Sequence, residues 1–338
     1  MDDAVLTGYD VIGDVHGHVQ PLQVLLSSMG YMQHDGVWGH PNRQAVFVGD
    51  LVDRGAHQVE VVRLVRAMVM AGTAQIVMGN HEYNAVAWAT RDPEVPGGHL
   101  RSHSLRHRTQ HQAFLDQVGE SSPLHDEFVE WFRTIPLWLE LELDGNCLRV
   151  VHACWHPASM DVLRFLTNDD RTLTTDGWSA TSRRGSAEYD ALEVVLKGPE
   201  VRLPEGLAYY DKDGHSRTKA RVRWWDPTAD TLRRGTLIPP GSRDADGNPF
   251  PPLPDVGYRH EVACPDDVPV IVGHYWEQVP GHLWSPKVAC VDYSVAKSGP
   301  LVAYRWSGET ELDVDRYVYA RGSSAEDTPG EGFGDDIE

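Results

Sequence analysis

The sequence lacks the features that mark membrane proteins, disulfide-rich scaffolds and general nucleic-acid binders. It has no run of about 18 consecutive apolar residues, and residues 1–14 carry no basic side chain, so we expect a cytoplasmic protein without a membrane partner. Only four cysteines occur, and none forms a CxxC pair, which argues against a disulfide framework or a structural zinc site. Basic residues are outnumbered by 50 acidic ones to 30, giving a net charge of −20. Stable nucleic-acid binding through a basic surface is therefore not expected.

Apolar residues are plentiful, at 41% of a 338-residue chain, and suffice for a large core. We expect one domain over residues 1–320, with an elaborated insertion at about 160–260 that is rich in Asp, Arg, Gly and Pro. Residues 322–338 are acidic and nearly free of apolar side chains, so we expect a disordered tail there. The sequence does not indicate an oligomeric state.

Alternating elements dominate the first half of the chain. Short apolar runs that each end at a glycine-led motif predict buried strands at 9–12, 45–48 and 75–78. Apolar positions at helical spacing, or segments free of Gly and Pro, predict helices at 20–29, 57–71, 80–89, 124–134 and, within the insertion, 188–197. The order β-α-β-α-β predicts a sheet with crossover helices, with each motif at the carboxyl end of a strand.

A second sheet is predicted from the pattern after residue 136. Apolar and polar positions alternate on both sides of Asp144-Gly145, a pair that favours a tight hairpin turn. Further short strands are expected at 268–272, 287–291, 300–306 and 312–318, all in this second sheet. The predicted fold class is α/β (α+β), a two-sheet β-sandwich flanked by helices.

Five short motifs carry side chains that bind divalent metals. They are GDVHG at 13–17, GDLVDRG at 49–55, GNHE at 79–82, VVHACW at 150–155 and VGHYW at 272–276. The candidate ligands, all oxygen or imidazole-nitrogen donors, are Asp14, His16, Asp50, Asn80, His152 and His274. Such donors suit a pair of ions such as Mn, Fe, Co, Ni or Zn. Two ions about 4 Å apart can activate water and clamp both the attacking and the leaving oxygen at phosphorus. The motifs therefore predict phosphoester hydrolysis.

The ordered set resembles the calcineurin-like metallophosphoesterases, in particular the phosphoprotein-phosphatase branch, which includes serine/threonine phosphatases and the symmetrical diadenosine tetraphosphatases of bacteria. The resemblance covers roughly residues 9–155 and 268–306. It implies the four-layer fold of that family and two divalent ions, with Mn favoured. It also implies the ligand sets: Asp14 and His16 on the first ion, Asp50 bridging, and Asn80, His152 and His274 on the second. A hydroxide that bridges the ions would be the nucleophile.

The same resemblance gives roles to three more residues. His81 matches the family's proton donor to the leaving oxygen, and Asp53 matches the carboxylate that orients that imidazole. Arg54 matches a clamp for two phosphate oxygens. Other branches end in GHXH, whereas this chain has Trp276 at the last position, which cannot bind a metal. This departure favours the phosphoprotein-phosphatase branch.

Two basic islands stand out in the acidic chain. Histidines recur at every fourth residue from His99 to His111 and would form one stripe on a helix. We favour a solvated face or a lid over a metal-binding stripe, and keep Arg106 and Arg108 as candidates for holding a second phosphate. In the second island, alternating Lys219, Arg221 and Arg223 would share one face of a strand. Since phosphatases of the resembled branch place an arginine from their middle region over the phosphate, Arg221 is a candidate substrate ligand.

Several residues near the motifs have ordinary structural explanations. Glu82 is expected to act as a first-turn carboxylate that the helix dipole favours, rather than as a metal ligand. Cys154 is expected to be a packed residue. Tryptophans 224, 225 and 276 are expected in the core or at the rim of the site, with base stacking as the alternative.

The function predicted from these features is dinuclear-metal-dependent phosphoester hydrolysis, on nucleotide polyphosphates such as diadenosine tetraphosphate or on small phosphoesters. The alternative is a serine/threonine protein phosphatase, for which a phosphoprotein would be the partner. A catalytically silent binding module on the same fold is the remote alternative.

Overall fold

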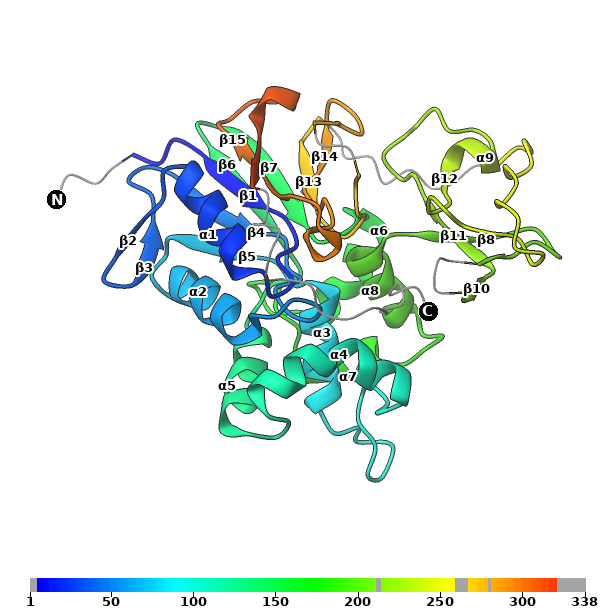
Figure 1. Ribbon diagram of the computed structural model, residues 1–338, viewed down its shortest axis with the longest axis horizontal. Helices are drawn as coiled ribbons and strands as arrows, with labels where there is room; N and C mark the ends of the chain where they lie inside the picture. Colours follow the sequence, from blue (N-terminus) through cyan, green and yellow to red (C-terminus); the bar gives the residue numbers. More distant parts are fainter. Residues whose placement is uncertain (1–4, 211–213, 259–266, 279–280, 321–338) are drawn as a thin grey trace.

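The computed structural model describes residues 5–210, 214–258, 267–278 and 281–320, and two sheets form its centre (Figure 1). In spatial order, the first contains β16 (Tyr317–Ala320), β15 (Leu301–Trp306), β1 (Tyr9–Ile12), β4 (Gln44–Phe47) and β5 (Ala74–Ile76). The second contains β14 (Val288–Cys290), β13 (Val270–Val272), β7 (Asn146–Val151) and β6 (Trp138–Leu143). Strands β1, β4 and β5 are parallel, and so are β7, β13 and β14. The carboxyl ends of the parallel strands within each sheet therefore lie at one edge.

Successive side chains along these strands enter two different cores. Val11 and Ile271 pack between the two sheets, whereas their neighbours Ile12 and Val272 pack against helices. This alternation is the pattern of strands covered on both faces, because neighbouring strand residues point to opposite sides of a sheet. The predicted β-sandwich with helices outside, in four layers, is confirmed.

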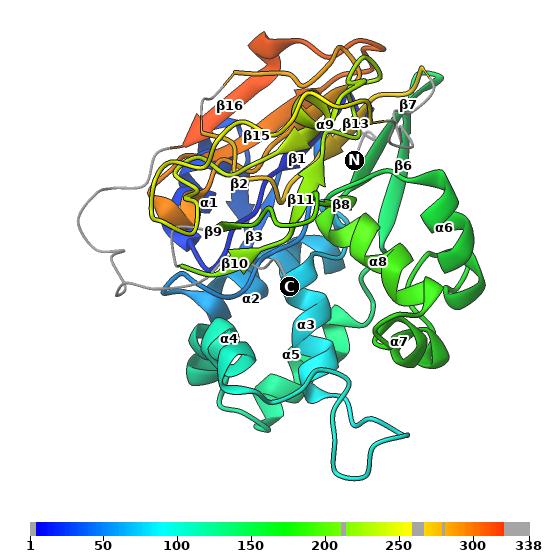
Figure 2. The same cartoon turned by 90° about the vertical axis from the view of Figure 1, so that its right-hand side faces the viewer.

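The outer layers consist of helices from both halves of the chain. Helices α1 (Val19–Ser28) and α2 (Gln58–Met70) cover the first sheet. Helices α6 (Pro157–Leu163) and α8 (Ala187–Lys197) lie on the side of the second sheet (Figures 1 and 2). A further group gathers at one end of the sandwich: α3 (Asn80–Ala89), α4 (Leu105–Val118), α5 (Pro123–Phe132) and α7 (Thr175–Thr181). No helix in the described ranges is long and apolar enough to cross a membrane.

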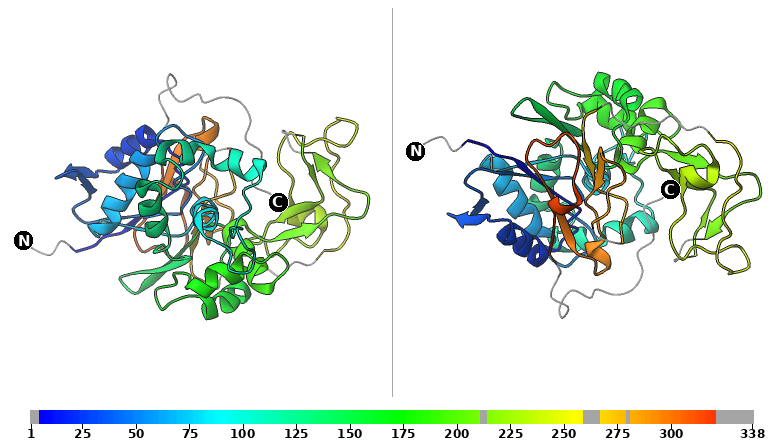
Figure 3. Two further views of the ribbon diagram at one scale, coloured as in Figure 1. Left: turned by 90° about the horizontal axis from the view of Figure 1, so that it is seen from below. Right: turned by 90° about the horizontal axis from the view of Figure 1, so that it is seen from above.

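The expected insertion divides into two parts. Its helices α6, α7 and α8 pack into the main core, as buried Met160, Trp178 and Val195 show. The remainder is a lobe that stands to one side (Figures 1 and 3), built from β8 (Glu200–Arg202), β9 (Tyr209–Tyr210), β10 (Ser216–Arg217), β11 (Lys219–Val222), α9 (Leu232–Gly235) and β12 (Thr236–Leu237). The lobe has a small core of its own around Tyr209 and Leu232. The single-domain assignment stays a prediction, and the tail at 322–338 lies outside the described residues.

Most predicted elements are confirmed, and two assignments at the end of the chain are wrong. Strands β15 and β16 join the first sheet, with β15 antiparallel to β1, rather than the second. The run 312–318 is not one strand, because the side chain of Asp313 caps a 3₁₀ turn, Val314–Arg316, before β16 begins at Tyr317. Elements not expected from the sequence include the β2–β3 hairpin (Met32–His34 and Val37–Gly39), η1 (Arg164–Leu166) and η2 (Val295–Lys297). Within or beside the insertion, α6, α7, α9 and the strands β8, β9, β10 and β12 were also not expected, since the helix at 188–197 and a strand with Lys219, Arg221 and Arg223 were the elements predicted there.

Candidate metal centre

The five motifs meet because each follows the carboxyl end of a central strand. Strands β1, β4 and β5 lead to the first three motifs, and β7 and β13 lead to the two histidine motifs. The six predicted ligands are all buried: Asp14, His16, Asp50, Asn80, His152 and His274. The structure thus brings together every residue that the sequence proposed as a metal ligand, although their role as ligands stays a prediction.

Left-handed backbone turns aim these side chains. His16, Asp50 and His274 have φ values of 44°, 51° and 70°, which non-glycine residues adopt at a cost. Two glycines allow the second and third motifs to touch: a Cβ on Gly49 would lie 2.4 Å from the backbone nitrogen of Gly79. This close approach lets the backbone N–H of His81 donate to Asp50 Oδ1 at 3.0 Å. Backbone strain is thus concentrated where the side chains converge.

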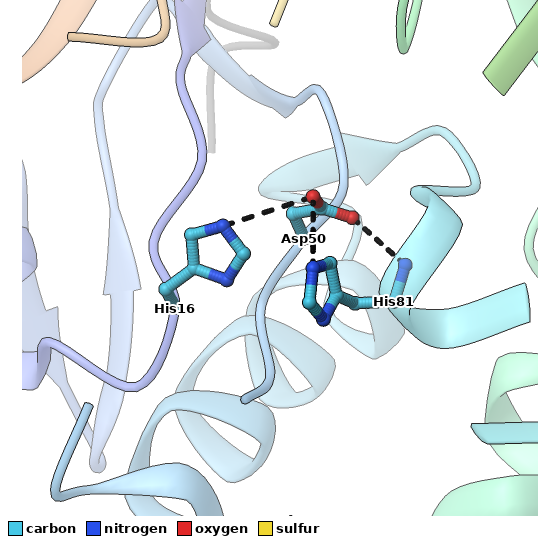
Figure 4. A group of neighbouring side chains, drawn as sticks. All are labelled: His16, Asp50 and His81. Atoms are coloured by element: carbon cyan, nitrogen blue, oxygen red, sulfur yellow. Dashed lines mark hydrogen bonds and ion pairs between the residues drawn. The ribbon is translucent and has the colours of Figure 1, made fainter. Parts of the chain in front are cut away.

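Asp50 stands at the middle of the imidazole cluster. Its Oδ2 lies 3.7 Å from Nε2 of His16, 3.9 Å from Nε2 of His81 and 3.4 Å from Nε2 of His152; Figure 4 shows the first two. In the described residues two groups have ligand atoms close enough to hold an ion, namely His16, Asp50 and His81, and Asp50, His152 and His274. Both groups share Asp50, as a carboxylate that bridges two ions would.

The hydrogen bonds of the histidines leave nitrogen lone pairs that fit a cation. His16 donates from Nδ1 to the carbonyl of Val52 at 2.8 Å, and its buried Nε2 has no hydrogen-bond partner among the described residues. His152 donates from Nδ1 to the carbonyl of Val48, so its Nε2 faces Asn80 Oδ1 at 3.1 Å and Asp50 Oδ2. A nitrogen that faces two oxygen acceptors requires a proton or a metal ion between them. Accordingly, although burial opposes it, the Asp50 carboxylate raises the pKa of His152 to about 9.

Several buried carboxylates add to the case for bound cations. Asp14 accepts the backbone N–H of His274 at 3.2 Å, and burial followed by the nearby charge of Asp292 raises its pKa well above the usual value. Asp292 is itself buried and accepts the backbone N–H of Trp276 at 2.9 Å. Concentrating carboxylates in a desolvated site is costly unless cations neutralise them. The residues present therefore fit a pair of divalent ions.

His81 carries its partner carboxylate as predicted. Its Nδ1 donates to Asp53 Oδ2 at 2.6 Å, which leaves Nε2 on the side of Asp50. A residue missed by the sequence completes the arrangement: His111, on α4, donates from Nδ1 to Asp53 Oδ1 at 2.8 Å. Burial would raise the pKa of Asp53, but His111 and His81 hold it well below the usual range.

The expected histidine stripe does not form. Only His107 and His111 lie on α4, because that helix begins at Leu105, and His111 is buried rather than solvated. His103 instead stacks between His99 and the indole of Trp88. The recurrence at every fourth residue was a signal for His111, but it did not reveal that its partner is Asp53.

Glu82 has a larger role than the expected first-turn carboxylate. Its two oxygens accept the backbone N–H groups of Asp50 and Leu51, each at 2.8 Å. Burial and then the charge of Asp50 raise the pKa of Glu82 to about 7. Glu82 thus holds the loop that carries the central carboxylate, and its position inside the GNHE motif was the only sequence signal for this.

Replacing Glu82 with Gln should loosen this loop. A glutamine has one acceptor oxygen, so one of the two backbone donors would be left unpaired or would face the amide N–H₂, and we expect the free energy of unfolding to fall by about 1–3 kcal/mol. Urea denaturation of the variant beside Glu130→Gln, an exposed acid on α5, checks this. Equal stability of Glu82→Gln and the native chain would contradict the clamp.

Three cationic side chains surround Trp276 at the site. The guanidinium carbons of Arg54 and Arg221 lie 5.1 Å and 5.7 Å from the centre of its ring, and Nζ of Lys297 lies 3.8 Å from it. Arg221, from β11 of the lobe, donates to Nε2 of His274 at 2.9 Å. Arg54 and Arg221 therefore lie close together beside Trp276, and their role as substrate ligands stays a prediction. Nothing in the local sequence of Lys297 marked it as a neighbour of Trp276.

The other basic side chains considered as substrate ligands make their described contacts outside the metal centre. Arg108 pairs with Glu120 at 3.0 Å and covers the ring of Trp88, while Arg106 lines a pocket beside α3. Lys219 is exposed and pairs with Glu200 at 3.5 Å. Arg223 is exposed too, so of these three alternating residues Arg221 is the buried one, and it contacts His274. Substrate contacts by Arg106 and Arg108 stay predictions.

The structural explanations given to the aromatic and cysteine residues are mostly confirmed. Trp224 and Trp225 are buried in the core, where Trp225 stacks on Trp284 with ring centres 3.6 Å apart. Cys154 is fully buried. Trp276 is partly exposed and lies at the rim.

Comparison with known proteins identifies relatives that match part of the chain. This chain is 38% identical over 130 residues to the asymmetrical bis(5'-nucleosyl)-tetraphosphatase PrpE of Halalkalibacterium halodurans, and the match covers 36% of this chain and 53% of the relative. The PrpE of Oceanobacillus iheyensis is 34% identical over 134 residues, covering 39% and 51%. A serine/threonine phosphatase structure from Saccharomyces cerevisiae aligns with 96% of this chain and 82% of that one, at 14% identity and a TM-score of 0.49.

The chain spans about half the length of the curated relatives it matches. Their names specify the asymmetrical tetraphosphatases, whereas the motifs resembled a branch that includes the symmetrical ones. The model of the calcineurin-like phosphoesterase family matches residues 9–203, more than half of the chain and four of the five motifs. This chain belongs to the calcineurin-like phosphoesterase family.

Proposed function

We propose that this protein is a two-metal phosphohydrolase that cleaves nucleotide polyphosphates of the bis(5'-nucleosyl) type. The observation that carries the proposal is Asp50, whose carboxylate is shared by two groups of buried metal-ligating side chains. The similarity to PrpE tetraphosphatases supports the substrate class. When bound, two divalent ions would supply a nucleophile from water near neutral pH and neutralise charge on the phosphoryl oxygens.

The protein's own residues bind the phosphate and deliver a proton. Arg54 and Arg221 approach Trp276 from separate segments and can donate to the phosphoryl oxygens, since guanidinium groups match phosphate geometry. In its imidazolium form His81 gives its Nε2 proton to the leaving oxygen and becomes neutral, while Asp53 accepts its Nδ1–H and fixes the orientation of the ring. The proposed ligands of the first ion are Asp14, His16 and Asp50, and those of the second are Asp50, Asn80, His152 and His274, with Mn as the proposed metal.

A product-resolved assay tests the proposed substrate. The Mn-loaded protein is given diadenosine tetraphosphate, a phosphothreonine peptide and bis-p-nitrophenyl phosphate, each beside an Asp50→Asn control, and its native metal content is measured by mass spectrometry. We expect preferential cleavage of the dinucleotide. AMP with ATP indicates an asymmetrical cut, and ADP alone a symmetrical one. Preferential release of phosphate from the peptide would instead assign a protein phosphatase, and inactivity on all three would overturn the hydrolase.

A cytoplasmic location is part of the proposal. Cys147, Cys154 and Cys290, the described cysteines, are all free thiols, as is usual in a reducing compartment. Cell fractionation checks this, and recovery outside the cytoplasm would contradict it.

His111 should affect proton delivery without touching the substrate. His111→Leu removes the donor to Asp53 Oδ1, whereas His111→Asn keeps an N–H near the position of Nδ1. We expect the leucine variant to lower kcat on phenyl phosphate by about 10-fold or more, and on 2,4-dinitrophenyl phosphate, whose leaving group needs no proton, by less than about threefold. The asparagine variant should recover most of the loss. Equal losses on both esters would show a merely structural role.

A further inference from the structure

A cavity of about 440 Å³ lies in the lobe that stands to one side of the sandwich (Figure 3). None of its lining residues belongs to the five motifs. Its walls come from the segment 233–253 and include the apolar side chains of Ile238, Phe250 and Leu253. Five prolines complete the apolar surface: Pro239, Pro240, Pro249, Pro251 and Pro252. A cavity of this size with mostly apolar walls is typical of small-molecule sites in proteins. We name it the proline pocket.

Hydrogen bonds and ring packing within the lobe hold the walls of the proline pocket in place. The segment 242–250 folds back on itself: the backbone N–H of Asp244 donates to the carbonyl of Asn248 at 2.8 Å, and that of Phe250 to the carbonyl of Ser242 at 2.9 Å. The ring of Phe250 packs edge-on against Tyr209 of the lobe's core, with ring centres 5.8 Å apart. The prolines restrict the backbone further, because their rings fix φ. A ligand therefore meets a preformed surface.

Two exposed arginines supply the charge of the proline pocket. Arg233 donates from Nε to the carbonyl of Leu253 at 2.6 Å, and Arg243 donates from Nη1 to the carbonyl of Gly247, also at 2.6 Å. Each guanidinium has five N–H donors, so these bonds use only a minority of them. In the part of the chain that the structure describes, neither arginine pairs with a carboxylate, and no acidic residue lines the pocket. The carboxylate of Asp244, next to Arg243 in sequence, instead accepts backbone N–H groups of its own turn.

Charge and shape together select the kind of ligand. Two guanidinium groups without a described carboxylate partner favour an anion, in a chain whose net charge is −20. The hydroxyl groups of Thr236 and Ser242 already donate to backbone carbonyls, and prolines have no N–H, so the arginines are the main donors. Guanidinium groups also stack on aromatic rings. This surface therefore fits an anion of one or two charges on a flat apolar body, and it offers little to a purely hydrophilic polyphosphate.

We propose that the proline pocket binds an aromatic acid, with its ring on Phe250 and the prolines and its anionic group on Arg233 and Arg243. The inference does not depend on the proposed function, because none of the candidate metal ligands lines this pocket. The pocket nevertheless adjoins the strand that supports Arg221. Leu237, which lies between the lining residues Thr236 and Ile238, is the partner of Arg221 in the pairing of β11 with β12.

Fluorescence titration of the full chain with 8-anilinonaphthalene-1-sulfonate tests the proline pocket. We expect saturable binding to the native protein, and an affinity at least about tenfold lower for the double variant Arg233→Gln with Arg243→Gln, since hydrogen bonds to charged groups are among the stronger ones. The matched control is Arg164→Gln with Arg234→Gln, which removes two exposed arginines that pair with acids outside the pocket and changes the net charge equally. Equal affinity of the two double variants, or no saturable binding by the native protein, would overturn the proposal.

A second measurement uses the native protein alone and so does not depend on the folding of variants. N-phenyl-1-naphthylamine has the same rings as the first probe but no sulfonate, and we expect it to bind at least about tenfold more weakly. Bound sulfonate probe should be displaced by 1-naphthoate, and not by inorganic phosphate at the same concentration, because phosphate has no apolar part. Equal affinity for the charged and the neutral probe, or stronger displacement by phosphate than by 1-naphthoate, would contradict a site for aromatic acids.

Discussion

Replacement of Asp50 by asparagine should abolish hydrolysis and reduce the amount of bound metal. The carboxylate is the one group common to both clusters of candidate ligands, and its Oδ2 is within 4 Å of three imidazole nitrogens. An amide has the same shape but no charge, so it offers a single weak oxygen donor in place of a bridging anion. We expect kcat/KM to fall by about 10³-fold or more, which corresponds to about 4 kcal/mol of transition-state stabilisation. Metal analysis by mass spectrometry and kinetics on the same preparations provide the measurement.

A second buried carboxylate provides the control for this experiment. Asp10 on β1 is fully buried and pairs with Arg43 at 2.8 Å and Arg305 at 3.0 Å, away from the metal ligands. Asp10→Asn should lower the melting temperature while metal content and turnover per folded molecule are retained. Full metal occupancy together with native turnover in Asp50→Asn would refute the shared-ligand assignment.

Replacement of His81 by asparagine should slow turnover by about 10²-fold or more on an alkyl phosphate ester, with both metal ions still bound. The imidazole is held by Asp53 at Nδ1, so its Nε2 is the nitrogen able to give a proton to the leaving oxygen. The defect should shrink as the leaving group becomes more acidic, because a stable leaving anion does not need the proton. A series of aryl phosphates with graded leaving groups measures this dependence.

The geometry also offers a competing role for His81, as a ligand beside His16 and Asp50. Metal content separates the two roles: a proton donor can be removed without loss of metal, whereas removal of a ligand weakens binding of one ion. His125→Asn is the matched control, since His125 is buried on α5 outside the centre. A His81→Asn protein that has lost one ion, or that cleaves an alkyl ester at the native rate, would refute the donor assignment.

The sequence predicted those parts of the site whose residues lie close together in the chain. Asp14, Asp50 and Asn80 each follow an apolar run and a glycine, so strand, turn and functional side chain lie within a few neighbouring residues. Their convergence follows from the parallel order of β1, β4 and β5, which the β-α-β pattern predicts. Helix α3 was predicted with its observed bounds, Asn80–Ala89, because that segment contains no Gly or Pro.

The parts that were missed depend on partners distant in sequence. His111 meets Asp53 across 58 positions, and Glu82 meets the backbone of Asp50 across 32. The period of histidines therefore suggested a surface stripe, although tertiary packing buries its last member. Likewise, the apolar run of β15 identifies a strand but not the sheet it joins, because strand pairing is decided by the whole fold.

The hydrogen bond from Arg221 to His274 connects the lobe to a candidate ligand of the metal centre. An imidazole nitrogen has one lone pair, so Nε2 of His274 can accept the guanidinium proton or coordinate an ion, but not both. If Nε2 of His274 holds an ion as proposed, Arg221 would lose this acceptor, and its guanidinium would be available for an anionic substrate. The lobe that carries Arg221 would in that case couple metal binding to substrate capture.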